Sequence, residues 1–284
     1  MAIRIDEGPL TDRAVNGPAL YYTTAVPEGA PVAGLGLLHG YADHGARYHH
    51  VIGALAEMGI AVVALDMRGH GRAAGRRGYC ERFSEYMDDV AELPALLHRV
   101  AKDAPHFLFG HSFGGLVAAQ AQLQPNKHPW KGLVLSAPFV RLAMAVPKVK
   151  LWAGELASKL YPTLGLPSGL HGADLTHDAE RARGYDDDPL VFPKATARWF
   201  TETKRAQDHL FAHASKIELP LYMAFGEADR VASFEGGREL FQKVGSKDKT
   251  FVPYPGLFHE ILNEPSWKEI AEGMAKFVLD HAKK

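Results

Sequence analysis

The sequence predicts an α/β fold, in which helices flank a mostly parallel central sheet and a helical cap is inserted late in the chain. Two observations predict it. Short apolar runs alternate with segments of helical spacing over most of the 284 residues, which is the pattern of a parallel sheet covered on both faces. The alternation stops between residues 138 and 206 and then resumes. A chain of this length can hold one large α/β domain with such an insertion.

The first elements follow from turn chemistry and apolar runs. Asn16-Gly17 separates two short β-like runs and predicts an N-terminal hairpin. Residues 32–38 form a near-continuous apolar run, as expected for a strand buried on both faces. The next predicted elements are a helix over 48–58, a strand over 60–65, a helix over 83–100, a strand over 106–110, a helix over 115–123 and a strand over 132–136.

An apolar stripe begins the inserted segment. Val149, Trp152, Leu156 and Leu160 recur at helical spacing after Pro147, a good residue for a first helical turn. We interpret this stripe as packing within the cap. The alternative is an amphipathic lid that makes transient contact with a membrane or micelle, although the helix lacks a basic polar face.

Alternation resumes after the insertion. The acidic run 186–189 is interpreted as a solvated turn, because it ends in a proline. Strands over 220–225 and 250–252 and a last helix from about Pro265 complete the chain. We assign residues 1–137 and 207–284 to the core and residues 138–206 to a helical cap, or lid, over the active site.

Composition excludes several classes of protein. Hydrophobic residues make up 46%, charged residues 23%, and the formal net charge is -1, so we expect no nucleic-acid partner. Cys80 is the single cysteine, which rules out an intrachain disulfide and a cysteine zinc site. The N-terminus lacks the apolar core of a signal peptide, and no apolar run approaches the ~18 residues of a membrane span. We expect a soluble, cytoplasmic protein, and leave its oligomeric state open.

The segment Gly110-His111-Ser112-Phe113-Gly114 carries the chemistry. It stands between a short buried run and a helix of small residues. A G-x-S-x-G in this context is a nucleophile elbow, a sharp turn that presents the serine hydroxyl at the end of a strand. Ser112 is therefore the predicted nucleophile.

A serine hydroxyl needs a base to take its proton, and the base needs an acid to orient it. In enzymes built on this elbow, the acid and then the histidine follow the serine in the chain. Asp229 lies in the loop after the predicted strand 220–225, with Glu227 as the competing carboxylate. Two histidines come later: His281 in the terminal helix and His259 in a loop after a strand. We predict the triad Ser112, Asp229 and His259.

The oxyanion formed during attack needs preorganised donors. The backbone N–H of Phe113, directly after the nucleophile, is one predicted donor. The other is the N–H of Tyr41, in the loop after the strand over 32–38. Because both donors are main-chain groups, the identity of the side chains at positions 41 and 113 says little about the oxyanion hole itself.

These motifs resemble the α/β-hydrolase superfamily, and within it the monoacylglycerol lipase/lysophospholipase-like group of the serine aminopeptidase S33 type. The likeness extends over nearly the whole chain from Leu37. Its motifs are His39-Gly-Tyr-Ala-Asp-His44 with Arg47-Tyr48, Asp66-Met-Arg-Gly-His-Gly71, Gly110-His-Ser-Phe-Gly-Gly115, Gly226-Glu-Ala-Asp-Arg230 and Gly256-Leu-Phe-His259. The resemblance implies no metal, no organic cofactor and a cap that shapes an acyl pocket. Two positions depart from the group's usual residues: Asp43 replaces a glutamate and Ala73 a serine.

The predicted function is hydrolysis of carboxylic esters of lipid-like or small acyl substrates, by a lipase or esterase. Three alternatives use the same triad: an amide hydrolase, a carbon–carbon bond hydrolase and an acyltransferase. A non-catalytic member of the fold that binds an acyl ligand is the alternative from another class.

The remaining histidines support no metal site. His209 and His213 share one face of a predicted helix, but no H-E-x-x-H pattern surrounds them. We expect His39 and His70 to order loops through hydrogen bonds. His111, next to the nucleophile, is a rival base that the geometry of the elbow disfavours. No dinucleotide-binding glycine pattern is complete, so no cofactor is expected.

Overall fold

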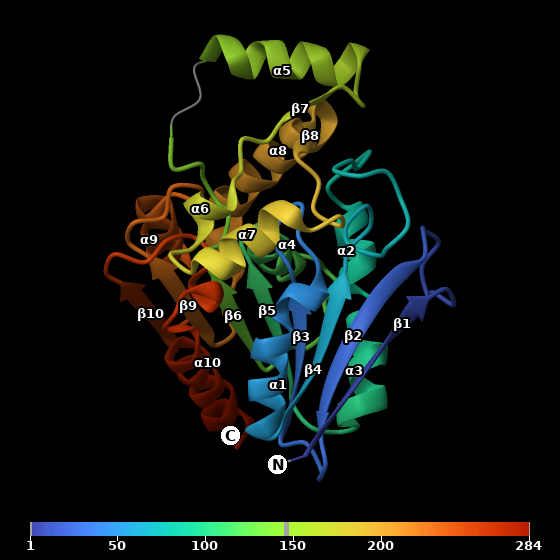
Figure 1. The fold of residues 1–284 in the computed structure, drawn as a ribbon, viewed down its shortest axis with the longest axis vertical. Coiled ribbons are helices and arrows are strands. Elements are labelled where there is room, and N and C mark those ends of the chain that lie inside the picture. Colours follow the sequence, from blue (N-terminus) through green and yellow to red (C-terminus); the bar gives the residue numbers. More distant parts are fainter. Residues whose placement is uncertain (1, 145–147, 284) are drawn as a thin grey trace.

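An eight-stranded sheet forms the centre of the computed structural model, which describes residues 2–144 and 148–283 (Figure 1). The strand order is β1-β2-β4-β3-β5-β6-β9-β10. The strands are β1 (Ile3–Leu10), β2 (Leu20–Pro27), β3 (Ala33–Leu38), β4 (Ile60–Asp66), β5 (His106–His111), β6 (Gly132–Ser136), β9 (Leu221–Gly226) and β10 (Lys249–Tyr254). Strand β2 is antiparallel to β1 and β4. Strands β4, β3, β5, β6, β9 and β10, in this order across the sheet, are parallel to their neighbours. The predicted fold class is confirmed.

The inner strands are recognisable in the sequence because they are buried on both faces. Every residue of β3, β4 and β9 is buried, which explains their continuous apolar runs. The predicted hairpin is formed by β1 and β2, paired from Ile3 with Pro27 to Leu10 with Leu20. Asn16-Gly17 lies within the longer loop between them.

Helices cover both faces of the sheet (Figure 1). The face with α1 and α10 packs their apolar side chains against the inner strands. The other face is covered by α2, α3, α4 and α9. The helices are α1 (His49–Glu57), α2 (Glu85–Val90), α3 (Leu93–Ala101), α4 (Phe113–Ala121), α9 (Phe234–Lys243) and α10 (Trp267–Ala282), with 3-10 turns η1 (Gly45–Tyr48), η2 (Ala214–Lys216) and η3 (Ile261–Asn263).

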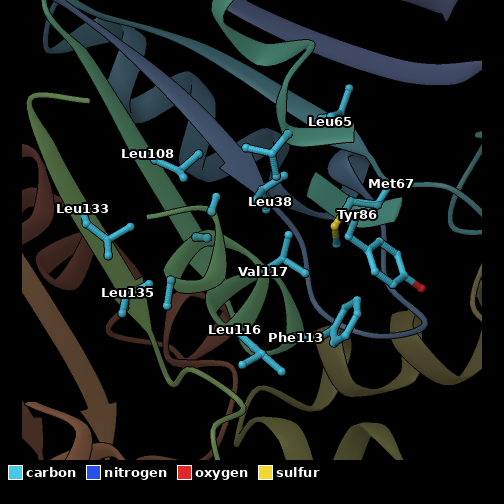
Figure 2. Packing of buried hydrophobic residues seen from close by; sticks show 14 of the residues in the cluster. Leu38, Leu65, Met67, Tyr86, Leu108, Phe113, Leu116, Val117, Leu133 and Leu135 are labelled. Atoms are coloured by element: carbon cyan, nitrogen blue, oxygen red, sulfur yellow. The ribbon is translucent and has the colours of Figure 1, made fainter. Parts of the chain in front are cut away.

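The core beneath α4 holds the elbow in place. Figure 2 shows Leu38, Leu108 and Leu133, from three adjacent strands, in the same buried cluster as Leu116 and Val117 of α4. All five side chains are buried. Because each large buried aliphatic side chain contributes roughly 1.5–3 kcal/mol, this layer anchors the helix that begins directly after Ser112.

The helix predicted over 83–100 is two helices, α2 and α3. Pro94 stands in the first turn of α3, where a proline is tolerated because the N–H that it lacks would have no partner there. Inside a continuous helix its ring would clash with the carbonyl of Val90. The backbone therefore breaks between Val90 and Leu93.

The segment between β6 and β9 lies over the carboxyl ends of the parallel strands (Figure 1). Its elements are α5 (Lys148–Leu160), β7 (Gly165–Pro167), α6 (Gly172–Leu175), α7 (Ala179–Asp187), β8 (Lys194–Thr196) and α8 (Ala197–His213). Pro147 lies outside the described residues. Helix α8 is continuous across residue 206, and the boundaries of the cap stay a prediction. Among the described residues, none of the helices combines the length and apolar character that a membrane crossing requires.

The apolar stripe of α5 does not pack inside the cap. Val149, Trp152 and Leu160 are 69%, 67% and 63% exposed. Helix α5 instead contacts α8 through its other side, where the hydroxyls of Ser158 and Thr201 lie 2.8 Å apart. Helical spacing defines a face but not its partner, so the expectation of cap packing is wrong.

The acidic run is also more ordered than expected. Asp186 is in the last turn of α7, and its Oδ1 accepts the N–H of Gly172 at 2.9 Å. Asp188 ends the helix and pairs with His44, whose Nε2 lies 2.9 Å from Oδ2. Pro189 then stops the helix, because the residue before a proline disfavours the helical conformation.

Candidate active site

Ser112 stands at the sharp turn between β5 and α4. Its backbone has φ 52° and ψ -118°, a strained conformation for a non-glycine residue that is common at functional sites. Its N–H donates to the carbonyl of Ser136 at 2.9 Å. A Cβ at Gly114 would lie 2.3 Å from the carbonyl oxygen of Leu38, so only glycine allows α4 to approach the neighbouring strand here.

The three predicted triad side chains form one hydrogen-bonded chain. His259 Nε2 lies 2.7 Å from Ser112 Oγ, and His259 Nδ1 lies 2.7 Å from Asp229 Oδ2. A carboxylate only accepts, so Nδ1–H donates to Asp229 and Nε2 is left to accept the serine proton. Asp229 Oδ1 also accepts the N–H groups of Val231 and Ala232 at 2.7 and 2.9 Å. The catalytic role of Ser112, His259 and Asp229 stays a prediction.

The electrostatics of His259 follow from burial and two carboxylates. Burial disfavours the imidazolium, but the charge and hydrogen bond of Asp229 outweigh it, with a further contribution from Glu260. The net effect is a pKa of His259 raised above its ordinary value. This environment stabilises the imidazolium that forms when the histidine takes the serine proton.

The rival residues lie apart from this chain of hydrogen bonds. Glu227 is exposed. His281 pairs with Asp248, with Nε2 and Oδ2 3.0 Å apart. His111 Nδ1 lies 3.2 Å from Ser136 Oγ, and burial together with the neighbouring His259 lowers the pKa of His111 to about 4.

The loop of the predicted oxyanion donor passes next to the nucleophile. A Cβ at Gly40 would lie 3.5 Å from Ser112 Cβ, and Ala42 has φ 55°. Among residues 2–144 and 148–283, no acceptor engages the backbone N–H of Tyr41 or Phe113. Both N–H groups are thus free to bind an oxyanion, a role that stays a prediction.

Two histidines order the loops around this site. His39 Nδ1–H donates to the carbonyl of Gly40 at 2.7 Å, and Nε2 accepts the N–H of Met67 at 3.1 Å. His70 Nδ1 lies 2.9 Å from the carbonyl of Arg68. These contacts are those expected of residues that hold loops rather than react.

A buried cluster of charged side chains beside the triad was not predicted from the sequence. Arg47 contacts Asp43 and Glu260 at 2.9 and 2.7 Å. Asp43 in turn accepts the N–H groups of Gly40 and His44 and the hydroxyl of Tyr48. Burial alone would raise the pKa values of both carboxyls, but Arg47 lowers them below their ordinary range. In the sequence, the only local indication of this cluster is that Asp43 and Arg47 are four residues apart, about one helical turn.

A cavity of about 690 Å³ opens onto Ser112 and His259. Its size is within the usual range for small-molecule sites. Most of its wall is apolar and comes from the segment over the sheet. The apolar and aromatic lining residues from that segment include Leu142, Ala153, Gly154, Ala157, Leu164, Leu166, Leu170, Leu175, Tyr185, Trp199 and Phe200, and the polar ones are Ser168 and Thr196.

The histidine-rich composition produces no metal centre within the described parts of the chain, where no group of three or more His, Cys, Asp or Glu side chains could hold an ion. His209 and His213 lie on α8 with ring centroids 4.3 Å apart. His209 Nδ1 lies 3.1 Å from Gln120 Oε1. The pair therefore belongs to a helix face, as predicted.

Comparison with known proteins identifies the family. The family model described as serine aminopeptidase, S33 matches residues 29–266. The chain belongs to this α/β-hydrolase family. A monoacylglycerol lipase of Mycolicibacterium smegmatis is 32% identical over 273 residues, which cover 94% of this chain and 95% of that protein. Phospholipase YtpA of Bacillus subtilis is 29% identical over 87% of this chain and 95% of its own length.

A solved structure agrees with this membership. The monoacylglycerol lipase of Paleococcus ferrophilus has a TM-score of 0.82 and 28% identity, over 92% of this chain and 99% of that one. The matched S33 region runs from before β3 to the residue before α10. Ser112, Asp229 and His259 all lie within it.

Proposed function

We propose that this S33 family member is a carboxylic ester hydrolase of the monoacylglycerol lipase type, acting on lipid-like acyl esters through Ser112, His259 and Asp229. The observation that carries the proposal is the continuous hydrogen-bonded chain from Asp229 to Ser112, opening into a largely apolar cavity. The lipase and phospholipase relatives support the same class of reaction.

The geometry supports an acyl-enzyme mechanism. Ser112 Oγ attacks the ester carbonyl while His259 Nε2 accepts its proton, and the N–H groups of Tyr41 and Phe113 stabilise the oxyanion. His259 then gives the proton to the departing alcohol, leaving the acyl group on Ser112. A water molecule, deprotonated by His259, attacks this ester. The carboxylic acid is released as the bond to Ser112 Oγ breaks and His259 returns the proton to that oxygen. Asp229 holds the tautomer of His259 throughout.

The substrate class follows from the shape and lining of the cavity. The acyl chain occupies the apolar part, walled by α5, α8 and the segments between them. The alcohol part of the ester lies nearer to the polar lining residues, among them Asp43 and Glu260. We assign the selection of substrate to residues 138–206, acting as a cap over Ser112.

The exposed stripe of α5 supports contact with a lipid surface. Trp152 and Leu160 present apolar area to solvent, an arrangement typical of sites that meet membranes or partners. Transient contact through this face would bring the cavity to its substrate. Sedimentation with neutral lipid vesicles tests this, with Trp152→Glu expected to reduce binding and equal binding by both proteins counting against it. Cytoplasmic location stays a prediction.

The reaction is tested with p-nitrophenyl esters from acetate to palmitate and with a monoacylglycerol. The wild type should hydrolyse them with a preferred chain length, and Ser112→Ala should lose roughly 10⁶-fold in kcat, as triad serines do. Equal rates for the two proteins would overturn the proposal. Labelling of Ser112 by a fluorophosphonate without turnover of any ester would favour amide, carbon–carbon bond or acyl-transfer chemistry.

A further inference from the structure

The side chains of the two proposed oxyanion donors meet on one residue of α8. The ring centroid of Trp199 lies 3.8 Å from that of Tyr41 and 5.2 Å from that of Phe113. All three side chains are buried. The two proposed main-chain donors are thus connected to α8 through the side chains at positions 41 and 113.

Trp199 is held firmly at the start of α8. Its backbone N–H donates to the hydroxyl of Thr196, which itself donates to the carbonyl of Gly78 at 2.7 Å. The hydroxyl of Tyr41 donates to the carbonyl of Lys194 at 2.7 Å. The segment from Lys194 to Trp199 therefore contacts Tyr41 twice: Trp199 packs against its ring, and the carbonyl of Lys194 accepts a hydrogen bond from its hydroxyl.

The indole N–H of Trp199 is buried and has no hydrogen-bond partner among the described residues. An unpaired buried donor costs stability, about 1–3 kcal/mol for a typical group. No polar contact orients the indole ring itself, which is placed by packing and by the anchored backbone of α8. Its aromatic ring contacts among the described residues are those with Tyr41 and Phe113.

The same residue lines the cavity. Trp199 and its neighbour Phe200 both form part of the wall around the acyl site. Helix α8 also contacts α5, where Arg198 Nε donates to Ser158 Oγ at 3.0 Å. A substrate in the cavity thus contacts the ring that supports both donors.

We propose that Trp199 is a positioning residue for the oxyanion hole, which holds the backbone N–H groups of Tyr41 and Phe113 in place through their rings. The inference rests on the proposed function, because it takes those two groups as the donors. Displacements of about 1 Å at a reacting centre can cost 10²-fold in rate. Loss of a donor costs a similar or larger factor. The effect of Trp199 is therefore on kcat.

The test compares Trp199→Leu and Trp199→Phe with Trp130→Leu, a matched control at another buried tryptophan, which does not line the cavity. On p-nitrophenyl acetate, which leaves most of the cavity empty, Trp199→Leu should lower kcat roughly 10- to 100-fold with KM changed little. Trp199→Phe keeps a ring and should recover most of the rate. Trp130→Leu should leave acetate hydrolysis near the wild-type rate.

A trifluoromethyl ketone separates positioning from general damage. Ser112 Oγ adds to the ketone carbon, its proton passes to His259, and the carbonyl electron pair becomes an oxyanion in the hole. Trp199→Leu should weaken this adduct by the same factor as it lowers kcat, while labelling at Ser112 persists at a reduced rate. Unchanged affinity for the ketone, or equal losses in Trp199→Leu and Trp130→Leu, would overturn the inference.

Folding and function are checked separately. Thermal unfolding shows whether each variant is native, and if Trp199→Leu does not fold, Tyr41→Leu tests the same contact by removing the ring that packs on Trp199. That variant should lower kcat and ketone affinity together by a smaller factor, and no change in either would contradict the inference. A wild-type protein that neither hydrolyses esters nor labels at Ser112 would instead refute the proposed function.

Discussion

Arg47 and Glu260, 213 positions apart in the sequence, form a bidentate ion pair beside His259. The Nη1–Oε1 and Nη2–Oε2 distances are 2.8 and 2.7 Å. Their side chains are 10% and 6% exposed. Glu260 follows the proposed base in the chain, and Arg47 also contacts Asp43 of the oxyanion loop. The pair therefore joins the two loops that must face each other across Ser112.

Arg47→Met should destabilise the fold strongly. It leaves Glu260 and Asp43 buried without their cation, and breaking such a pair costs about 3–5 kcal/mol. Urea unfolding measures the change. Arg72→Met is the matched control, because its pair with Glu7 is 42% and 39% exposed and exposed pairs contribute about 0–1 kcal/mol. Similar losses in the two variants would contradict the prediction.

The dependence of activity on pH should follow His259. The neutral imidazole is the base, and the raised pKa of His259 keeps it protonated to a higher pH than a free histidine. The value of kcat/KM should therefore rise with pH through an apparent pKa above the ordinary 6.5. Hydrolysis of a short p-nitrophenyl ester, measured between acid and alkaline limits of stability, gives this value. An acid limb below 6.5 would show that burial outweighs Asp229.

Gly114→Ala should damage both stability and activity. The added Cβ would lie 2.3 Å from the carbonyl oxygen of Leu38 and 2.4 Å from that of His39, and both are backbone atoms leading into the oxyanion loop. Overpacking costs about 1–3 kcal/mol, and the displaced loop should lower kcat by roughly 10²-fold.

Gly184→Ala is the control for this change. Nothing lies within 4 Å of a Cβ at Gly184, inside α7, so alanine there should stabilise the protein by roughly 0.5–1 kcal/mol. Thermal unfolding and ester turnover of the two variants give the comparison. Wild-type turnover by Gly114→Ala would show that the loop does not depend on this close approach.

Ala157→Phe should shift preference to shorter acyl chains. Ala157 lines the cavity from α5, and a benzyl group in its place fills part of the acyl space. The ratio of palmitate to butyrate kcat/KM should fall at least 10-fold, within the range that one or two methylene-sized contacts supply. Leu156→Phe is the control, because Leu156 is 44% exposed and is not among the residues that line the cavity. A ratio that moves equally in both variants would place the acyl chain elsewhere.

Several features of the site were predictable because they depend on local rules. Parallel strands buried on both faces appear as apolar runs, and the carboxyl ends of such strands meet at one edge of a sheet. Asp229 and His259 follow predicted strands in the order expected of an elbow enzyme. Their loops could therefore be placed near Ser112 before any distance was known, and the structure brings the three side chains into hydrogen-bond contact.

Local sequence rules could not predict which face of a helix is buried when that depends on the element it packs against. The spacing of Trp152 and Leu160 defined a helix face, but its exposure depends on how α5 rests on α8. The break between the two helices found over 83–100, by contrast, follows a local rule, because Pro94 stands in the first turn of α3.

The sequence by itself determined the α/β class, the elbow at Ser112 and the pair of residues that complete the proposed triad, because strand burial and turn geometry impose short-range patterns. Only the tertiary structure revealed the ion pair of Arg47 with Glu260 and the contact of Trp199 with Tyr41. Both join residues more than a hundred positions apart, whose packing depends on the folding of the whole chain. No short-range periodicity records such a contact, since its energy depends on burial that exists only once the loops and α8 have come together.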